Sequence, residues 1–404
     1  MKKIIFTLFI ITCLLNNANT QWQLVSTLNY TYTFTVSGTN LFRGGINGVF
    51  LSTNNGVNWN NVTNELTSKE IWSLATSGST IFAGTYQGGV FISTNNGSNW
   101  IAKNNGLTSL TIPKLFVSGS NIFAGTYAGV FLSTDNGNSW IARNNGISNS
   151  IVNALEFSSP YLISGLWSGG IYRSTNYGIN WTKISTQNLV LSLAYLNTNL
   201  FAGSWGGIWL STNNGDNWTT MNNGLVDSVV ESLNVWGTNL FAGSRNGVFL
   251  TTNNGANWFD KNQGFGLPHY IQSLFITDNY IFAGTWNTGF WRRSLSEITN
   301  EFNTSSEIPE KFSLSQNYPN PFNAETKIKF DIPSGFPLGA YGNDKVVLKV
   351  FDLLGREVAA LVNESLQPGT YEVTFDGGNL PSGVYFYQLR TNNFVQTKNL
   401  ILLK

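Results

Sequence analysis

Three carboxylates, Glu70, Asp227 and Glu231, are the residues of this chain that could most readily do acid–base chemistry. Each precedes or enters a short apolar segment that predicts a strand, and two carboxylates are the minimum for ordinary glycoside hydrolysis. Their spacing does not indicate that they meet in space. The one histidine, His269, lies in a Gly-Leu-Pro-His-Tyr segment, where a packing or solvated side chain is commoner than a catalytic base.

The arginines of the same region do not predict a substrate-carboxylate site. They fall at unrelated positions of the repeat described below, so we do not expect three of them to converge on one ligand. They are Arg43, Arg143, Arg173, Arg245, Arg292 and Arg293.

A set of large side chains recurs at one position of a sequence repeat. Each lies four residues after the anchor, which is the first residue of a segment that reads Phe-Ala-Gly-Thr or a close relative. The set comprises Ile46, Tyr86, Tyr127, Trp167, Trp205, Arg245 and Trp286. Aromatic faces with nearby amides suit sugars or extended peptides, so Tyr86, Tyr127, Trp167, Trp205, Arg245 and Trp286 are candidate ligand-binding residues. The alternative is that these side chains pack between neighbouring repeats.

The elements that carry these residues follow from the repeat itself. The hairpin Ser52-Thr-Asn-Asn-Gly-Val-Asn-Trp59 recurs with its tryptophan at 59, 100, 140, 181, 218 and 258. A period near 40 residues is typical of a four-stranded propeller blade. The strand anchors number seven, at Phe42, Phe82, Phe123, Ile163, Phe201, Phe241 and Phe282. We therefore predict a seven-bladed β-propeller over residues 21–296, in which Trp22 and the strand after it complete the last blade.

The repeated hairpin has a structural interpretation. Its glycine is expected at positive φ, and its Ser and Asn side chains are expected to bond the turn's own amides. The octapeptide resembles the Asp box, or BNR repeat, of sialidases, certain glycoside hydrolases and photosystem assembly factors. That resemblance implies a structural motif remote from any active site, so Trp59, Trp100, Trp140, Trp181, Trp218 and Trp258 are predicted to be structural. The box position that is acidic in the family is Asn in five copies and Asp only at Asp135, which argues against calcium.

Composition excludes several classes of protein. Only 11% of the residues are charged and the net charge is +1, so we expect no nucleic-acid partner. Lys2 and Lys3 followed by an apolar run to Leu15 predict a secretory signal peptide over residues 1–20, with no transmembrane segment in the mature chain. The only cysteine, Cys13, lies in this leader, so neither a metal nor another cofactor is expected.

After a polar segment at 297–311, predicted to be a linker, the pattern changes. Alternating apolar and polar residues at 326–332, then further strands between 346 and 404, predict a second, immunoglobulin-like β-sandwich over 312–404. The overall prediction is thus an all-β protein. A carbohydrate-binding module is one alternative for the second domain.

The same residues carry a second resemblance. Asn317-Tyr-Pro-Asn-Pro-Phe-Asn323, Val350-Phe-Asp-Leu-Leu-Gly-Arg356 and Pro381-Ser-Gly-Val-Tyr-Phe-Tyr387 precede an apolar, basic-ended terminus. Together they resemble the C-terminal sorting domain of the type IX (Por) secretion system. The resemblance implies export to the cell surface or the medium, with the translocon and a sorting peptidase as partners.

The sequence favours a secreted or cell-surface propeller that acts by binding rather than catalysis, with a glycan or a protein of the cell envelope as ligand. We expect the ligand to bind on the face opposite the Asp-box hairpins, where the register of large side chains would surround the mouth of the central channel. The blades stay alike, whereas an enzyme usually breaks its repeat to build one pocket. The competing hypothesis is a carbohydrate-active glycoside hydrolase, sialidase-like or xyloglucanase-like, that uses the same channel mouth.

Overall fold

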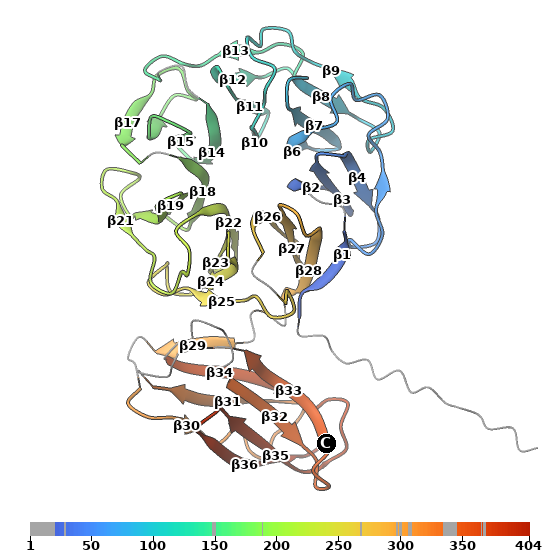
Figure 1. Ribbon diagram of the computed structural model, residues 1–404, viewed down its shortest axis with the longest axis vertical. Helices are drawn as coiled ribbons and strands as arrows, with labels where there is room; N and C mark the ends of the chain where they lie inside the picture. The colour runs from blue at the N-terminus through green and yellow to red at the C-terminus, as the bar shows by residue number, and fades with distance from the viewer. Residues whose placement is uncertain are drawn as a thin grey trace, which may run out of the picture.

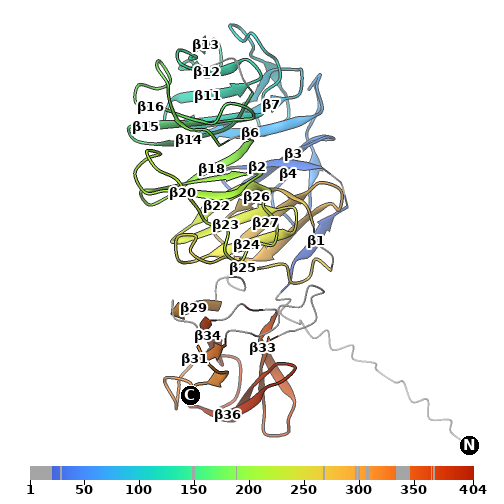
Figure 2. The ribbon, with the colours of Figure 1, turned by 60° about the vertical axis from the view of Figure 1, so that its left-hand side comes forward.

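The computed structural model describes residues 21–27, 30–147, 151–187, 189–266, 269–295, 298, 301–305, 309–333, 346–364, 366 and 369–404. The predicted signal peptide lies outside these residues. The described chain forms a ring of four-stranded antiparallel sheets and a separate two-sheet domain (Figure 1). Figure 2 shows the ring turned towards its edge, with the two-sheet domain beyond β25.

The ring has seven blades, as predicted. Blade 1 comprises β2 (Thr31–Ser37), β3 (Asn40–Gly45), β4 (Gly48–Ser52) and β5 (Asn60–Asn61). Blade 2 comprises β6 (Ile71–Ser77), β7 (Thr80–Thr85), β8 (Val90–Ser93) and β9 (Ile101–Ala102). Blade 3 comprises β10 (Lys114–Ser118), β11 (Asn121–Thr126), β12 (Gly129–Ser133) and β13 (Ile141–Ala142). Blade 4 comprises β14 (Val152–Ser158), β15 (Tyr161–Leu166), β16 (Ile171–Ser174) and β17 (Thr182–Ser185). Blade 5 comprises β18 (Val190–Leu196), β19 (Asn199–Ser204), β20 (Gly207–Ser211) and β21 (Thr219–Thr220). Blade 6 comprises β22 (Val230–Trp236), β23 (Asn239–Ser244), β24 (Gly247–Thr251) and β25 (Phe259–Asp260). Blade 7 comprises β26 (Ile271–Ile276), β27 (Tyr280–Thr285), β28 (Phe290–Ser294) and β1 (Gln23–Ser26).

The Phe-Ala-Gly signature lies on the second strand of each blade, and the packing of this strand against the next blade accounts for it. The anchors Phe42, Phe82 and their equivalents are fully buried in the clusters between blades. The glycine of the signature lets the next blade approach closely, because a Cβ at Gly84 would lie 2.8 Å from Ile112 and one at Gly243 would lie 2.7 Å from Ile271. Side chains larger than hydrogen at this position would therefore force the blades apart.

The hairpin between the third and fourth strands has the predicted turn chemistry. In blade 1, Ser52 Oγ accepts a hydrogen bond from the Gly56 N–H at 2.9 Å, and Asn54 Oδ1 accepts one from the Asn58 N–H at 2.9 Å. Gly56 has a φ of 76°, in the left-handed region that favours glycine. Equivalent bonds recur in the other five hairpins.

The hairpin tryptophans form two groups that differ in the carbonyl to which the indole N–H donates. Only Trp59 and Trp218 donate their indole N–H within that turn, to Gly56 and Gly215. The other four donate to a carbonyl of the preceding blade at 2.8 Å, and all four are buried: Trp100 to Val62, Trp140 to Lys103, Trp181 to Arg143 and Trp258 to Met221. These tryptophans therefore join adjacent blades.

Trp22 closes the ring, as predicted. Strand β1 pairs antiparallel with β28, so that the N-terminal strand is the outer strand of blade 7. The Trp22 indole N–H donates to the Lys261 carbonyl of blade 6 at 2.6 Å, the position equivalent to Val62, and its ring stacks on Phe265 at 4.7 Å. Arg293, which stands where the other blades have the hairpin Ser or Thr, donates to the same carbonyl at 3.3 Å.

The C-terminal domain is a β-sandwich with one core between two antiparallel sheets. One sheet has the order β29 (Glu301–Ser305), β34 (Gly369–Asp376), β31 (Glu325–Ile332) and β30 (Ser313–Leu314). The other has the order β33 (Glu357–Glu364), β32 (Val346–Phe351), β35 (Gly383–Arg390) and β36 (Val395–Leu402). Strand β29 corrects the sequence interpretation, because it lies within the predicted linker and pairs with β34 as an edge strand.

Candidate functional site

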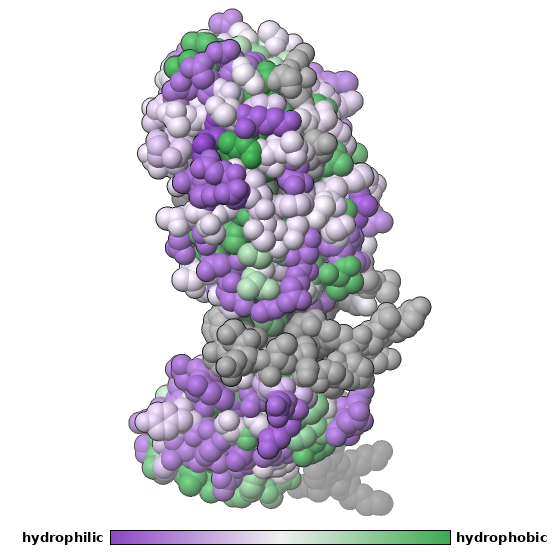
Figure 3. Space-filling model, turned by 90° about the vertical axis from the view of Figure 1, so that its left-hand side faces the viewer, coloured by the Kyte–Doolittle hydropathy of each residue, from purple (hydrophilic) through white to green (hydrophobic). Residues whose placement is uncertain are grey.

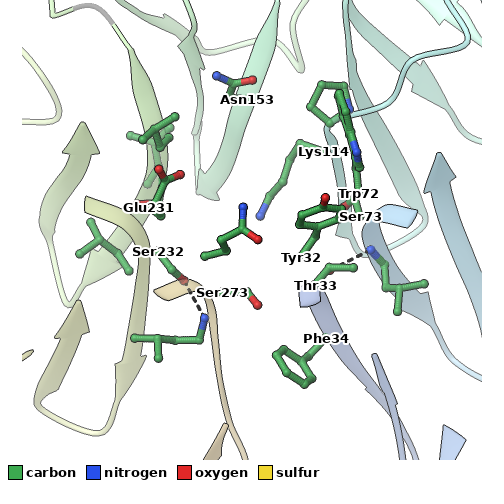
Figure 4. A pocket seen from close by; sticks show the side chains of 18 of the residues that line it. Tyr32, Thr33, Phe34, Trp72, Ser73, Lys114, Asn153, Glu231, Ser232 and Ser273 are labelled. Carbon is green, nitrogen blue, oxygen red and sulfur yellow. Dashed lines mark hydrogen bonds between the residues drawn. The ribbon is translucent and has the colours of Figure 1, made fainter. Parts of the chain in front are cut away.

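The innermost strands of all seven blades surround a cavity of ≈ 880 Å³ at the centre of the ring (Figure 4). Its lining includes Tyr32, Trp72, Lys114, Asn153, Leu191, Glu231 and Gln272, one residue from each of the seven strands. By contrast, the side of the ring seen in Figure 3 is mainly polar with separated apolar residues. The central cavity is thus where many different side chains converge.

The six candidate ligand-binding residues predicted from the repeat all lie in the turns between the second and third strands of their blades. The five aromatic members are 37–43% exposed, so each presents part of its ring to solvent. Tyr127, Trp167 and Trp286 line the cavity. Ile46, the seventh member of the register, is exposed as well.

Contacts join aromatic rings of blades 4, 5, 7 and 1 and the Arg245 guanidinium of blade 6 into one row, here called the rim arc. Trp167 and Trp205 lie 6.3 Å apart between ring centroids, and the Arg245 guanidinium lies 5.0 Å from the Trp205 ring and 5.2 Å from the Tyr270 ring. The row continues through Tyr270, stacked on Trp286 at 5.6 Å, to Tyr30 at 5.3 Å from Trp286. The rim arc consists of Trp167, Trp205, Arg245, Tyr270, Trp286 and Tyr30.

A second group, here called the Glu70 cluster, lies on blades 1 to 3 and consists of Glu70, Tyr32, Trp72, Tyr86 and Tyr127. Trp72 stacks on Tyr86 at 4.9 Å and lies 6.0 Å from Tyr127, and its indole N–H donates to Glu70 Oε1 at 2.9 Å. Burial, and then the charge of Glu70, raise the pKa of Tyr32 to about 12. The pKa of Tyr127 is raised by burial, by Tyr86 and by the same carboxylate.

Four aromatic residues at the channel, Tyr30, Tyr32, Trp72 and Tyr270, were not predicted from the sequence. All four stand just before an innermost strand or at its second residue, and they are not at one repeat position. The available signal was that aromatic residues gather at the starts of these strands, at the end of the blade where the predicted register also lies.

Three glutamates line the cavity, and each has a different environment. Burial raises the pKa of Glu231, although the Tyr270 hydroxyl donates to it at 2.5 Å and Arg245 lies nearby. Burial raises the pKa of Glu156 to about 7, despite the Phe157 N–H at 3.1 Å and the attraction of Lys114. Desolvation also lowers the pKa of the Lys114 ammonium group.

The other residues considered for chemistry have structural surroundings. Asp227 accepts the Val229 N–H at 3.0 Å and is not among the cavity-lining residues. His269 is buried and packs against Phe265 and Trp291 at 4.9 and 5.0 Å.

Arginines do not converge on the cavity. Arg43 is buried over Phe50 and Phe290 at the junction of blades 1 and 7, Arg173 pairs with Asp216 at 2.9 Å, and Arg292 donates to the Asn55 carbonyl. Arg245 alone among the six has described contacts with the channel rim. Within the described ranges, no three His, Cys, Asp or Glu side chains are grouped to hold a metal ion, and no helix is long and apolar enough to cross a membrane.

Comparison with known proteins identifies the C-terminal domain. Residues 316–403 match the family described as the secretion system C-terminal sorting domain. The match indicates secretion to the cell surface or the medium, through interaction with the type IX machinery. No curated protein matches the chain.

The ring resembles solved β-propellers. YCF48 bound to D1 peptide superposes with a TM-score of 0.54 and 14% identity over 68% of this chain and 96% of that one. The extracellular domain of a one-component system from B. thetaiotaomicron gives a TM-score of 0.56 and 15% identity over 95% of this chain and 58% of that one. The GH74 enzyme of Niastella koreensis gives 0.54 and 12% over 95% and 75%. Identities this low show the fold alone.

Proposed function

We propose that this protein is a secreted or cell-surface binding protein whose propeller holds an extended glycan or peptide across the mouth of the central channel. The observation that carries the proposal is the rim arc, a row of exposed and half-buried rings beside a cavity lined with amides and charged groups. Aromatic faces supply contact area at low entropic cost, and amides supply directional hydrogen bonds. On the hairpin face, by contrast, four of the six tryptophans are engaged in joining blades.

We expect the double variant Trp167→Ala, Trp286→Ala to lose binding at least tenfold, because stacking of a ligand on an aromatic ring commonly contributes more than about 1 kcal/mol per ring. The full chain would be screened on glycan and peptide arrays, and affinity for any hit measured by calorimetry. Both side chains are partly exposed, so the variant should remain folded, which thermal unfolding would check. Tyr177→Ala is the matched control, since Tyr177 is an exposed aromatic residue of a hairpin on the opposite face. Equal affinity in the double variant and the wild type would contradict the proposal.

Export is proposed to follow a Sec-type leader and to end with removal of the sorting domain. We expect deletion of residues 309–404 to leave the chain in the periplasm, which cell fractionation would show. Removing only residues 398–404 is a poor test, because it deletes the fully buried Leu400 and Leu402 and would unfold the domain. Appearance of the truncated propeller in the medium at wild-type levels would contradict the role of the domain in export.

Glycoside hydrolysis is the second candidate function, and one observation favours it. Glu70, Glu156 and Glu231 line a single cavity, and the pKa of Glu156 is raised to about 7, the range of a general acid. The test is release of reducing ends from any glycan that the array identifies. Activity that Glu156→Gln abolishes would establish the enzyme, and binding without any turnover would leave the non-catalytic proposal.

A further inference from the structure

We infer that the Glu70 cluster binds a cationic side chain, lysine or arginine, of a peptide ligand. This inference rests on the proposed function and selects between its two ligand classes. The cluster offers three exposed or half-buried rings, Trp72, Tyr86 and Tyr127, together with Tyr32 and one carboxylate. Rings of this kind attract a cation to their faces, and a carboxylate beside them adds charge complementarity.

The opposite side of the rim shows how this molecule accommodates such a cation. Arg245 lies over the rings of Trp205 and Tyr270, and Glu231 is bonded to Tyr270. Aromatic faces, a carboxylate and a cation thus form one assembly on blades 5 to 7. The chain supplies that cation itself.

The Glu70 cluster has the aromatic faces and the carboxylate but no cation from the described part of this chain. Among the described residues, Glu70 has no ion pair, and no Arg or Lys lies over the rings of Trp72, Tyr86 or Tyr127. Lys114 lines the same cavity, but its charge interacts with Glu156. A cation brought by a ligand would therefore complete the assembly.

The charge of Glu70 favours a peptide over a neutral glycan. Covering an unpaired carboxylate with an uncharged ligand costs free energy, because the group loses water without gaining a cation. An arginine or lysine side chain offsets that cost, and its aliphatic stem can lie along the ring faces. A basic segment of an envelope protein meets these requirements.

The probe is the peptide acetyl-Gly-Arg-Gly-amide, with the citrulline peptide as its uncharged isostere. The full chain would be labelled with ¹⁵N, and the indole N–H signal of Trp72 assigned with Trp72→Phe. We expect a saturable shift with the arginine peptide, at least tenfold weaker binding of the citrulline peptide, and weakening as salt is raised. Glu70→Gln should weaken arginine binding about tenfold, whereas Asp227→Asn, a carboxylate outside the cavity, should not change it.

Equal binding of the citrulline and arginine peptides would overturn the inference, as would unchanged affinity in a folded Glu70→Gln variant. A neutral glycan that depends on Trp167 and Trp286 but not on Glu70 would also overturn it, and would leave the proposed binding function standing. Loss of both the peptide titration and every array interaction would remove the inference together with the function.

Discussion

Trp22→Ala is expected to lower the free energy of unfolding of the propeller by about 3–5 kcal/mol, the range for removing a large buried aromatic side chain. Trp22 is only 3% exposed, stacks on Phe265 and donates to the Lys261 carbonyl. Its loss would leave a cavity at the junction of blades 6 and 7 and remove the shorter of the two hydrogen bonds to the Lys261 carbonyl, the other coming from Arg293. Guanidinium unfolding followed by tryptophan fluorescence would measure the change, because all 14 tryptophans lie between residues 22 and 291 and report on the propeller alone.

Trp218→Ala is the matched control for this experiment. Trp218 is only half-buried and donates to Gly215 of its own turn, so its replacement should cost markedly less, about 1–2 kcal/mol. Equal losses in the two variants would show that Trp22 has no special role in closing the ring.

Glu156→Gln is expected to stabilise the propeller at pH 8 by about 1–3 kcal/mol and to have little effect at pH 5. The pKa of Glu156 rises from 4.5 to about 7 on folding, chiefly through burial. A carboxyl with a raised folded-state pKa contributes its stability below the unfolded value and loses it as pH rises through the folded value. Wild-type stability should therefore fall between pH 5 and pH 8 relative to the variant. Lys114 and Tyr195 are the ionisable neighbours, and the attraction of Lys114 is already included in the raised pKa.

The measurement is the difference in unfolding free energy between variant and wild type at several pH values, which cancels the titration of groups that do not interact with Glu156. Asp227→Asn is the control, because Asp227 accepts a local backbone hydrogen bond outside the cavity. A difference that is constant with pH, or larger at pH 5, would contradict the raised pKa.

Much of the fold could be predicted because the repeat reports local requirements. The buried anchors and the glycine after them are dictated by contacts that recur in all seven blades, and the hairpin glycines by a turn that recurs in six. The sequence has seven anchors but only six tryptophan hairpins, which predicted that Trp22 supplies the seventh tryptophan. The pairing of β1 with β28 confirms this prediction. Strand β29 was missed because its polar sequence resembles a linker and gains its partner only from β34.

The candidate site was predictable in part. The register at Tyr86, Tyr127, Trp167, Trp205, Arg245 and Trp286 was visible because it follows the repeat period. Tyr270 and Trp72 were not visible because they reach the rim from positions that differ between blades. Asp227 was grouped with Glu70 and Glu231 by its place before a strand, yet its side chain caps a turn.

The all-β class, the seven blades, the hairpin turns and the sorting domain follow from the amino-acid sequence alone, since each depends on residues close together in the chain or on a regular period. Which side chains meet at the channel depends on the tertiary structure. The innermost strands start some 40 to 240 residues apart in the chain, and ring closure brings these starts together at the mouth of the channel. The Arg245 contacts and the Glu70 cluster form there. Such contacts depend on the curvature of the whole ring, which no single repeat encodes.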